Sequence, residues 1–168
     1  LLASHRALHE VLAEEWAGRD AGLPYRTPYE ALIMASLVEK ETGVAEERQE
    51  IAGVFVRRLE KGMLLQTDPA VIYGLGESFD GNLTREHLRA PGPYNTYLNA
   101  GLPPSPIALP GRAAIHAALH PAPGSALYFV ARGDGSHEFS ASLEEHNRAV
   151  RKYQLQRRGT TYRSRPQG

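Results

Sequence analysis

Two carboxylates stand at the end of the most apolar stretch of the sequence, in the order Glu39-Lys40-Glu41. The run before them, residues 31–38, is apolar apart from Ser36. A carboxyl group at the end of a buried helix is poorly solvated, which raises its pKa towards about 6, a value suited to a general acid. We therefore predict that Glu41 is a catalytic acid. The pattern alone also allows a solvated carboxylate in the last turn of a helix.

The spacing of the two glutamates bears on mechanism. Two positions along an α-helix correspond to a rotation of about 200°, so Glu39 and Glu41 face nearly opposite ways. At most one of them looks into any one cleft. We expect Glu39 to support the site or its substrate rather than to act as a second catalytic carboxylate.

Amide, hydroxyl and aromatic side chains form a second group of candidates. Amides and hydroxyls hydrogen-bond to sugar hydroxyl and acetamido groups, and an aromatic ring stacks on the C–H face of a sugar. We predict a sugar-binding cleft that uses two such clusters: Gln66, Thr67, Asp68 and Tyr73, and Tyr94, Asn95, Thr96 and Tyr97. The alternative left open is that Asp68 caps a helix and that the tyrosines anchor loops.

Two histidines of the sequence have a spacing that could bind a metal ion. His116 and His120 are four residues apart, a helical spacing that can bind zinc from one face, and His137 could complete such a site. The segment reads His-Ala-Ala-Leu-His, however, and lacks the glutamate of the zinc-protease motif. The chain has no cysteine. We expect no metal and no cofactor, with a zinc enzyme as an alternative.

Charge is unevenly distributed along a chain whose formal net charge is zero. Residues 151–168 contain six basic residues and no acidic one, so the remainder carries a net charge of −6. A mildly acidic body argues against nucleic acid as the main ligand.

Periodicity and turn residues predict a mostly helical domain with one small hairpin. Arg132-Gly133-Asp134-Gly135 is the best hairpin signal, between strands at 126–130 and 137–140. The segment 90–110 has six prolines and two glycines, but its interspersed apolar residues favour an ordered loop packed on the core. The expected fold class is α+β. Helices are expected at 1–16, 28–42, 45–61, 68–73, 84–88, 111–120 and 142–156.

The chain length of 168 residues suits one domain. We assign residues 1–156 to it, with a leading helix within 1–19, and expect a disordered basic tail at 157–168. No apolar run approaches the roughly 18 residues that a membrane helix needs, and no signal peptide is visible. The chain begins at Leu1, already inside a helical pattern. We expect it to be a piece of a longer protein.

Several long segments together resemble one known family. They are VEKETGVAEER (38–48), GMLLQTDPAVIYGLG (62–76), PYNTYLNAGLPPSPIALPG (93–111), HP (120–121) and LYFVARGDGSHEFS (127–140). In order and spacing they resemble the MltG-type (YceG-like) endolytic murein transglycosylases across nearly all of residues 20–155. A match of several long segments is far more specific than one short motif.

The resemblance implies an activity and a place in the cell. The family cuts peptidoglycan glycan strands between N-acetylmuramic acid (MurNAc) and N-acetylglucosamine (GlcNAc). It leaves a 1,6-anhydroMurNAc end and is linked to terminating new strands beside peptidoglycan synthases. Its catalytic residue is the second glutamate of the E-K-E-T run, here Glu41. Members carry a membrane helix and a LysM-like domain facing the periplasm or cell exterior, neither of which is in this chain. The implied location is the outer face of the cytoplasmic membrane.

A single glutamate suffices for this chemistry because the substrate supplies its own nucleophile, the C6 hydroxyl. Ordinary glycosidases instead need two carboxylates at a set separation. Two rivals remain: a glycoside hydrolase that pairs Glu41 with a distant acid such as Asp68, and a peptidoglycan-binding module without catalysis.

Overall fold

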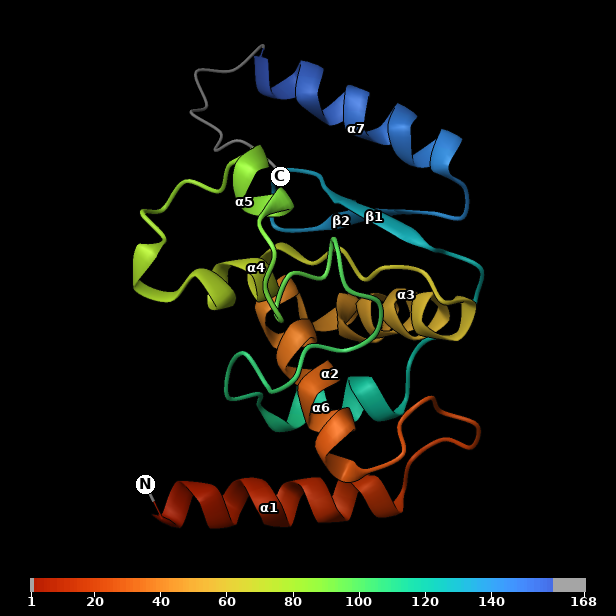
Figure 1. Cartoon of the computed structure of the whole chain (residues 1–168). Coiled ribbons are helices and arrows are strands. Elements are labelled where there is room, and N and C mark those ends of the chain that lie inside the picture. The colour runs from red at the N-terminus through yellow and green to blue at the C-terminus, as the bar shows by residue number, and fades with distance from the viewer. Residues whose placement is uncertain (1, 159–168) are drawn as a thin grey trace.

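The protein, described here from a computed structural model over residues 2–158, is a stack of layers with α1 at one end and α7 at the other (Figure 1). The mostly helical α+β fold expected from the sequence is confirmed. The elements are α1 (Leu2–Ala17), α2 (Pro28–Glu41), η1 (Ala45–Glu47), α3 (Arg48–Lys61), α4 (Asp68–Leu75), η2 (Gly76–Ser78), α5 (Arg85–Arg89), α6 (Arg112–Leu119), β1 (Tyr128–Ala131), β2 (His137–Ser140) and α7 (Leu143–Arg158).

Helix α2 is the centre of the fold. It begins where the Thr27 hydroxyl accepts a hydrogen bond from the Glu30 amide, with Pro28 in the first turn. Residues 31–38 are all buried because α1, α3, α4 and α6 surround the helix. Ser36, the polar exception, has its hydroxyl donating to the Ile33 carbonyl and accepting from the Ile107 amide at 3.0 Å. The buried polar atom is therefore fully used.

Helix α3 packs against α2 and α6. It ends at Lys61, and its C-cap Gly62 has a left-handed φ of 71°, a conformation for which glycine is favoured at helix C-termini. Gly53 lies inside this helix because the segment that follows α6 passes close to it. A Cβ atom there would lie 2.5 Å from the Ala122 carbonyl oxygen. The glycine lets the chain after α6 cross the helix closely.

The proline-rich segment 90–110 has no regular secondary structure, yet it is packed on the core as expected. Asn95 and Thr96 are buried. The side-chain amide of Asn95 donates to the carbonyl oxygens of Leu88 and Ala90, which fixes the loop to the end of α5. The loop is therefore part of the scaffold of the molecule.

Strands β1 and β2 form an antiparallel hairpin in which Tyr128 pairs with Ser140. Helix α7 packs against both strands, and the hairpin contacts α3 through β1, so α7 lies above the hairpin and the helical body lies below it (Figure 1). The expected cap is confirmed: the Ser142 hydroxyl accepts from the Glu145 amide at 3.2 Å. Helix α7 runs to Arg158, so the predicted tail loses its first two residues to the helix, and 159–168 lie outside the described residues.

Helix α4 differs from its expected form in two respects. Its N-cap is Thr67, so Asp68 is the first helical residue and not the cap. The helix also continues through Gly74 to Leu75, and a Cβ at Gly74 would lie 2.9 Å from the Tyr94 side chain. Gly74 is therefore explained by close packing against Tyr94 and not by termination of the helix. None of the helices within residues 2–158 is long and apolar enough to cross a bilayer.

Candidate active site

Glu41 is the last residue of α2 and lines a cleft of about 440 Å³. Its carboxylate oxygen Oε2 accepts a hydrogen bond from the Thr67 hydroxyl at 3.0 Å. The side chain is half-buried, so it is largely surrounded by protein but remains reachable from the cleft. The apolar run of α2 thus carries the carboxyl group out of the core to a solvent-connected surface.

The environment raises the pKa of Glu41 to about 7. Burial is the main cause because it disfavours the charged form, and the nearby negative charge of Asp68 acts in the same direction. The hydrogen bond from Thr67 stabilises the carboxylate and opposes both effects. A carboxyl group with this pKa can give up and take back a proton near neutral pH.

Thr67 is itself fixed by the proline-rich loop. Its amide donates to the Thr96 hydroxyl at 2.9 Å, and the Gln66 amide donates to the Thr96 carbonyl at 3.2 Å. Gln66 has a φ of 50°, in the left-handed region that a residue with a side chain rarely occupies. Such backbone strain is typical of functional sites, and here it occurs at a residue that lines the cleft beside Glu41.

Asp68 is a second carboxylate in the same cleft. The Tyr97 hydroxyl donates a hydrogen bond to its Oδ1. Burial raises the pKa of Asp68, and the hydrogen bond from Tyr97 lowers it in part. The segments 66–68 and 94–97 predicted to form a sugar site are therefore adjacent, and Gln66, Asp68 and Tyr97 line the cleft with Glu41.

The other candidates in these clusters lie elsewhere. Asn95 and Thr96 are buried scaffold residues whose polar groups bind backbone. Tyr73 and Tyr94 form a tilted aromatic pair, with centroids 4.9 Å apart, that is not among the residues lining the cleft. Thr67 is buried and meets the cleft through its bond to Glu41. Substrate contact by these five residues stays a prediction.

Glu39 points to a different part of the molecule, as the helical rotation predicts. Its Oε1 accepts a hydrogen bond from the Gly111 amide at 2.7 Å, where Gly111 is the N-cap of α6. A carboxylate at a helix N-terminus stabilises the unpaired amides there. Glu39 therefore ties α2 to α6 and does not share the cleft with Glu41.

The upper wall of the cleft comes from the hairpin and α7, which the sequence reading did not assign to the site. The Tyr128 ring contacts the Arg58 guanidinium, 4.9 Å from its centroid, and stacks with the His146 ring at 5.1 Å. The Nδ1 atom of His146 is buried without a hydrogen-bond partner, and burial lowers the pKa of this histidine. Further wall residues come from the same face of α7: Leu143, Asn147, Val150 and Gln154. The one sequence signal for this wall is the helical spacing of these four residues, which places them on a common face.

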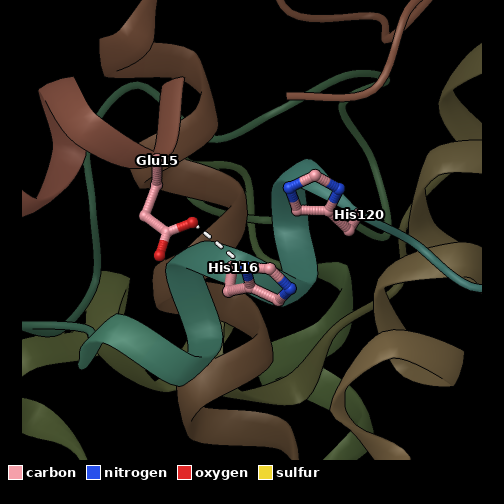
Figure 2. A group of neighbouring side chains, drawn as sticks. All are labelled: Glu15, His116 and His120. Atoms are coloured by element: carbon pink, nitrogen blue, oxygen red, sulfur yellow. Dashed lines mark hydrogen bonds and ion pairs between the residues drawn. The ribbon is translucent and has the colours of Figure 1, made fainter. Parts of the chain in front are cut away.

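The histidines considered for zinc are not brought to the cleft as a group of three. His137 is buried and its Nδ1 lies 2.9 Å from the Glu47 carboxylate. His116 and His120 lie on α6 and are accompanied by Glu15 of α1 (Figure 2). The three-histidine site that the sequence left open is therefore not formed among the described residues.

Comparison with known proteins identifies the family. A model of the YceG-like family matches residues 2–152, which is most of the chain. The chain belongs to the YceG-like family.

Named relatives and a solved structure agree with the family. The endolytic murein transglycosylase of Bacillus subtilis (strain 168) is 46% identical over 125 residues, covering 74% of this chain and 34% of that protein. The protein of the same name from Streptococcus pneumoniae (strain D39 / NCTC 7466) is 37% identical over 129 residues, covering 74% and 23%. A crystal structure of a yceG-like protein from Listeria monocytogenes superposes with a TM-score of 0.66 at 45% identity, covering 72% of this chain and 38% of that one. The chain thus spans about a third or less of the curated relatives.

Proposed function

We propose that this chain is the catalytic part of an endolytic peptidoglycan lytic transglycosylase that cleaves between MurNAc and GlcNAc. Two supports combine. Relatives that carry the name endolytic murein transglycosylase match 74% of the chain. The observation that carries the proposal is the half-buried Glu41 in a cleft, with a pKa raised to about 7.

In the first step, protonated Glu41 donates its proton to the glycosidic oxygen. The bond between that oxygen and C1 of MurNAc breaks, and an oxocarbenium-like centre develops at C1. The carboxylate left on Glu41 keeps the hydrogen bond from Thr67, which stabilises the new negative charge. The acetamido group of the substrate or fixed donors of the cleft steady the positive centre.

In the second step, the Glu41 carboxylate takes the proton of the C6 hydroxyl of the same sugar. The C6 oxygen forms a bond to C1 and closes the 1,6-anhydro ring, and Glu41 ends protonated as it began. No water is consumed. One glutamate serves as acid and then as base, which agrees with the position of Glu39 away from the cleft.

A second candidate function is hydrolysis with two carboxylates. The observation in its favour is that Asp68 lines the same cleft as Glu41. In that reaction Asp68 would activate water, and the product would have a reducing end instead of an anhydro ring. The hydrogen bond from Tyr97 engages one Asp68 oxygen and leaves the other for such a role.

The proposal extends to the cellular setting. Peptidoglycan lies outside the cytoplasmic membrane, so a longer protein containing this chain would act in the cell envelope, attached through a segment outside this chain. Cutting within a strand under synthesis would terminate it, and peptidoglycan synthases would then be its partners.

The test is mass spectrometry of soluble products after incubation with purified peptidoglycan, for the wild type and for Glu41→Gln. Wild-type protein is expected to release 1,6-anhydroMurNAc-ended fragments, and Glu41→Gln none. Circular dichroism establishes that the variant is folded. Glu39→Gln is the matched control, because the same change on the same helix falls outside the cleft and is expected to be milder.

Each other outcome has a definite meaning. Products heavier by one water identify a hydrolase and implicate Asp68. Binding of glycan strands without any product identifies a binding module. Near-normal turnover by Glu41→Gln removes Glu41 as the acid, and equal loss in both variants removes the distinction between Glu41 and Glu39.

A further inference from the structure

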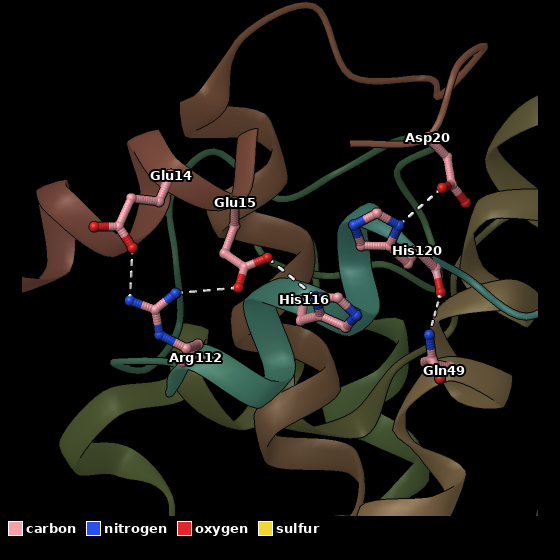
Figure 3. Close-up of polar contacts among 7 residues, drawn as sticks. All are labelled: Glu14, Glu15, Asp20, Gln49, Arg112, His116 and His120. Atoms are coloured by element: carbon pink, nitrogen blue, oxygen red, sulfur yellow. Dashed lines mark hydrogen bonds and ion pairs between the residues drawn. The ribbon is translucent and has the colours of Figure 1, made fainter. Parts of the chain in front are cut away.

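A group of polar side chains joins α1 to α6 on the side of the molecule away from the hairpin and α7 (Figures 1 and 3). Arg112 pairs with Glu14 at 2.9 Å and with Glu15 at 3.2 Å. The other Glu15 oxygen lies 3.0 Å from Nδ1 of His116. None of these side chains lines the cleft that contains Glu41.

Three side chains in this group have the chemistry of metal ligands. Glu15, His116 and His120 each offer one ligand atom, and these atoms lie within 4.8 Å of one another. His116 and His120 are four residues apart along α6, so both rings lie on one face, with centroids 4.3 Å apart (Figure 2). Imidazole nitrogen and carboxylate oxygen are ligands that suit zinc and neighbouring transition metals.

His120 is oriented as a ligating histidine commonly is. Its Nδ1 lies 2.8 Å from the Asp20 carboxylate, and because a carboxylate accepts, Nδ1 carries the proton. The other ring nitrogen then keeps its lone pair, and it lies on the side of Glu15 and His116 (Figure 3). A carboxylate bound to the distal nitrogen fixes the ring and raises its basicity in metal sites.

The backbone around His120 is also fixed. Its carbonyl oxygen accepts a hydrogen bond from the Gln49 side chain at 2.8 Å (Figure 3). The backbone amide of Asp20 donates to the Leu119 carbonyl at 3.0 Å. Asp20 is thus held next to His120 both by its side chain, which bonds to the ring, and by its backbone amide, which bonds to the preceding residue Leu119. A site whose parts are already positioned loses little entropy when an ion binds.

We propose that Glu15, His116 and His120 form a binding site for one divalent transition metal ion of the zinc class, separate from the catalytic cleft. The sequence led us to expect no metal because the His-Ala-Ala-Leu-His segment lacks the glutamate of the zinc-protease motif. In the folded chain a carboxylate comes instead from Glu15, 101 residues before His116. The ligand atoms need to converge from within 4.8 Å to the roughly 3.3 Å that zinc bonds of about 2.0–2.1 Å imply. Rotation of His116, whose side chain is 50% exposed, together with small adjustments of Glu15 and His120, supplies such a change.

The ion would link α1 to α6, two elements distant in sequence. Binding to the folded state alone stabilises that state, so the ion would hold the leading helix on the body. Arg112 opposes the ion by its charge and by its contact with Glu15. Removing that charge is therefore expected to strengthen metal binding. If Arg112, Glu14 and Glu15 served only as ion pairs between α1 and α6, the same change would only weaken the contact between these helices.

The test is isothermal titration of metal-stripped protein with zinc chloride. The wild type is expected to bind one ion, with a rise in Tm. Glu15→Gln and His120→Ala are each expected to raise the Kd by at least about tenfold, and Asp20→Ala by about tenfold through the orientation of His120. Zinc-induced shifts of the His116 and His120 ring signals in NMR spectra report the ligands directly, independent of any activity.

The chain offers a matched control on α1. His5 and His9 are also four residues apart and stacked, at 6.4 Å between centroids, but they belong to no group of three ligands among the described residues. The double variant His5→Ala/His9→Ala is expected to keep the wild-type Kd. Loss of zinc binding in that variant would place the ion on α1 and overturn the proposal.

Two further results would also overturn it. One is the absence of saturable zinc binding to folded wild-type protein. The other is an unchanged Kd in both Glu15→Gln and His120→Ala. Circular dichroism of each variant shows that it is folded, and Arg112→Gln, which leaves all three ligands in place, adds an independent variant expected to lower the Kd.

Discussion

The carboxyl group of Glu41 has neighbours that act on its proton in opposite directions. Burial and Asp68 favour the neutral acid, whereas the Thr67 hydroxyl favours the carboxylate. The result is a pKa of about 7, well above that of an ordinary glutamate but still within reach of neutral pH. Such a balance allows one side chain to donate a proton and then recover one, as the proposed reaction requires.

The pH dependence of turnover follows from this pKa. The first step uses protonated Glu41, so kcat/KM is expected to be highest in mildly acidic solution and to fall as pH rises through about 7. The measurement is the initial rate of soluble product release from peptidoglycan between pH 5 and 9. A rate that stays constant up to pH 9 would contradict the role of Glu41 as the acid.

Two substitutions next to Glu41 are expected to move this alkaline limb in opposite directions. Thr67→Val removes the hydrogen bond to the carboxylate and moves the limb to higher pH. Asp68→Asn removes a nearby negative charge, keeps an acceptor for Tyr97, and moves the limb to lower pH. Each shift is expected to be about one pH unit. Shifts in the same direction would contradict the electrostatic account.

The same pKa predicts a cost in stability. Between pH 4.5 and about 7 the folded protein retains a proton on Glu41 that the unfolded chain releases, so the free energy of unfolding falls as pH rises. Glu41→Gln is therefore expected to be more stable than the wild type by roughly 1 to 3 kcal/mol at pH 8, and nearly equal at pH 4. Urea unfolding at both pH values measures the difference.

Among the elements, helix α3 is shaped by a neighbour as much as by its own sequence. Gly53 is inside the helix, where alanine normally stabilises by about 1 kcal/mol. A Cβ there would approach the Ala122 carbonyl oxygen to 2.5 Å, and a backbone atom cannot move aside cheaply. Local propensity and tertiary packing thus make opposite predictions for the same substitution.

We expect packing to dominate, so that Gly53→Ala lowers the free energy of unfolding by about 1 to 3 kcal/mol. The control is Gly43→Ala, because a Cβ at Gly43 meets nothing within 4 Å and its φ is not in the left-handed region. Gly43→Ala is expected to be neutral or slightly stabilising. Chemical denaturation measures both, and a stabilised Gly53→Ala would refute the close crossing.

At the scale of the whole molecule, the cleft lies between the helical body and the layer formed by the hairpin and α7. Arg58 joins the two. It is only 7% exposed, and its guanidinium donates to the Leu127 carbonyl and to the Leu64 carbonyl, each at 2.6 Å. The same group lies beneath Tyr128. One buried cation therefore satisfies backbone on both sides of the cleft.

Removing this connection is expected to loosen the upper layer. Arg58→Met leaves the two part-buried carbonyl groups without this donor and should cost about 2 to 4 kcal/mol of stability. Hydrogen exchange in β1 and α7 should accelerate more than in α2. The control is Arg148→Met, which removes an arginine side chain that is 61% exposed and paired at 3.6 Å with Glu144, and should change stability by less than about 0.5 kcal/mol.

The sequence alone determined where the elements form and where the proposed acid, Glu41, stands at the end of α2. Periodicity, the Thr27 and Ser142 caps and the glycine turns act over a few residues, so they are readable locally, and the helices and hairpin occur close to where they predict. The two-residue spacing of Glu39 and Glu41 likewise fixed their divergence, because helical rotation depends only on position along the chain.

Only the tertiary structure decided what surrounds Glu41. The Thr67 hydroxyl reaches it across 26 residues, and Thr96 supports Thr67 across 29. The wall from α7 and the meeting of Glu15 with His116 across 101 residues depend on how whole layers pack. Such contacts arise from burial shared among distant segments, and no local pattern of residues specifies which segments will meet.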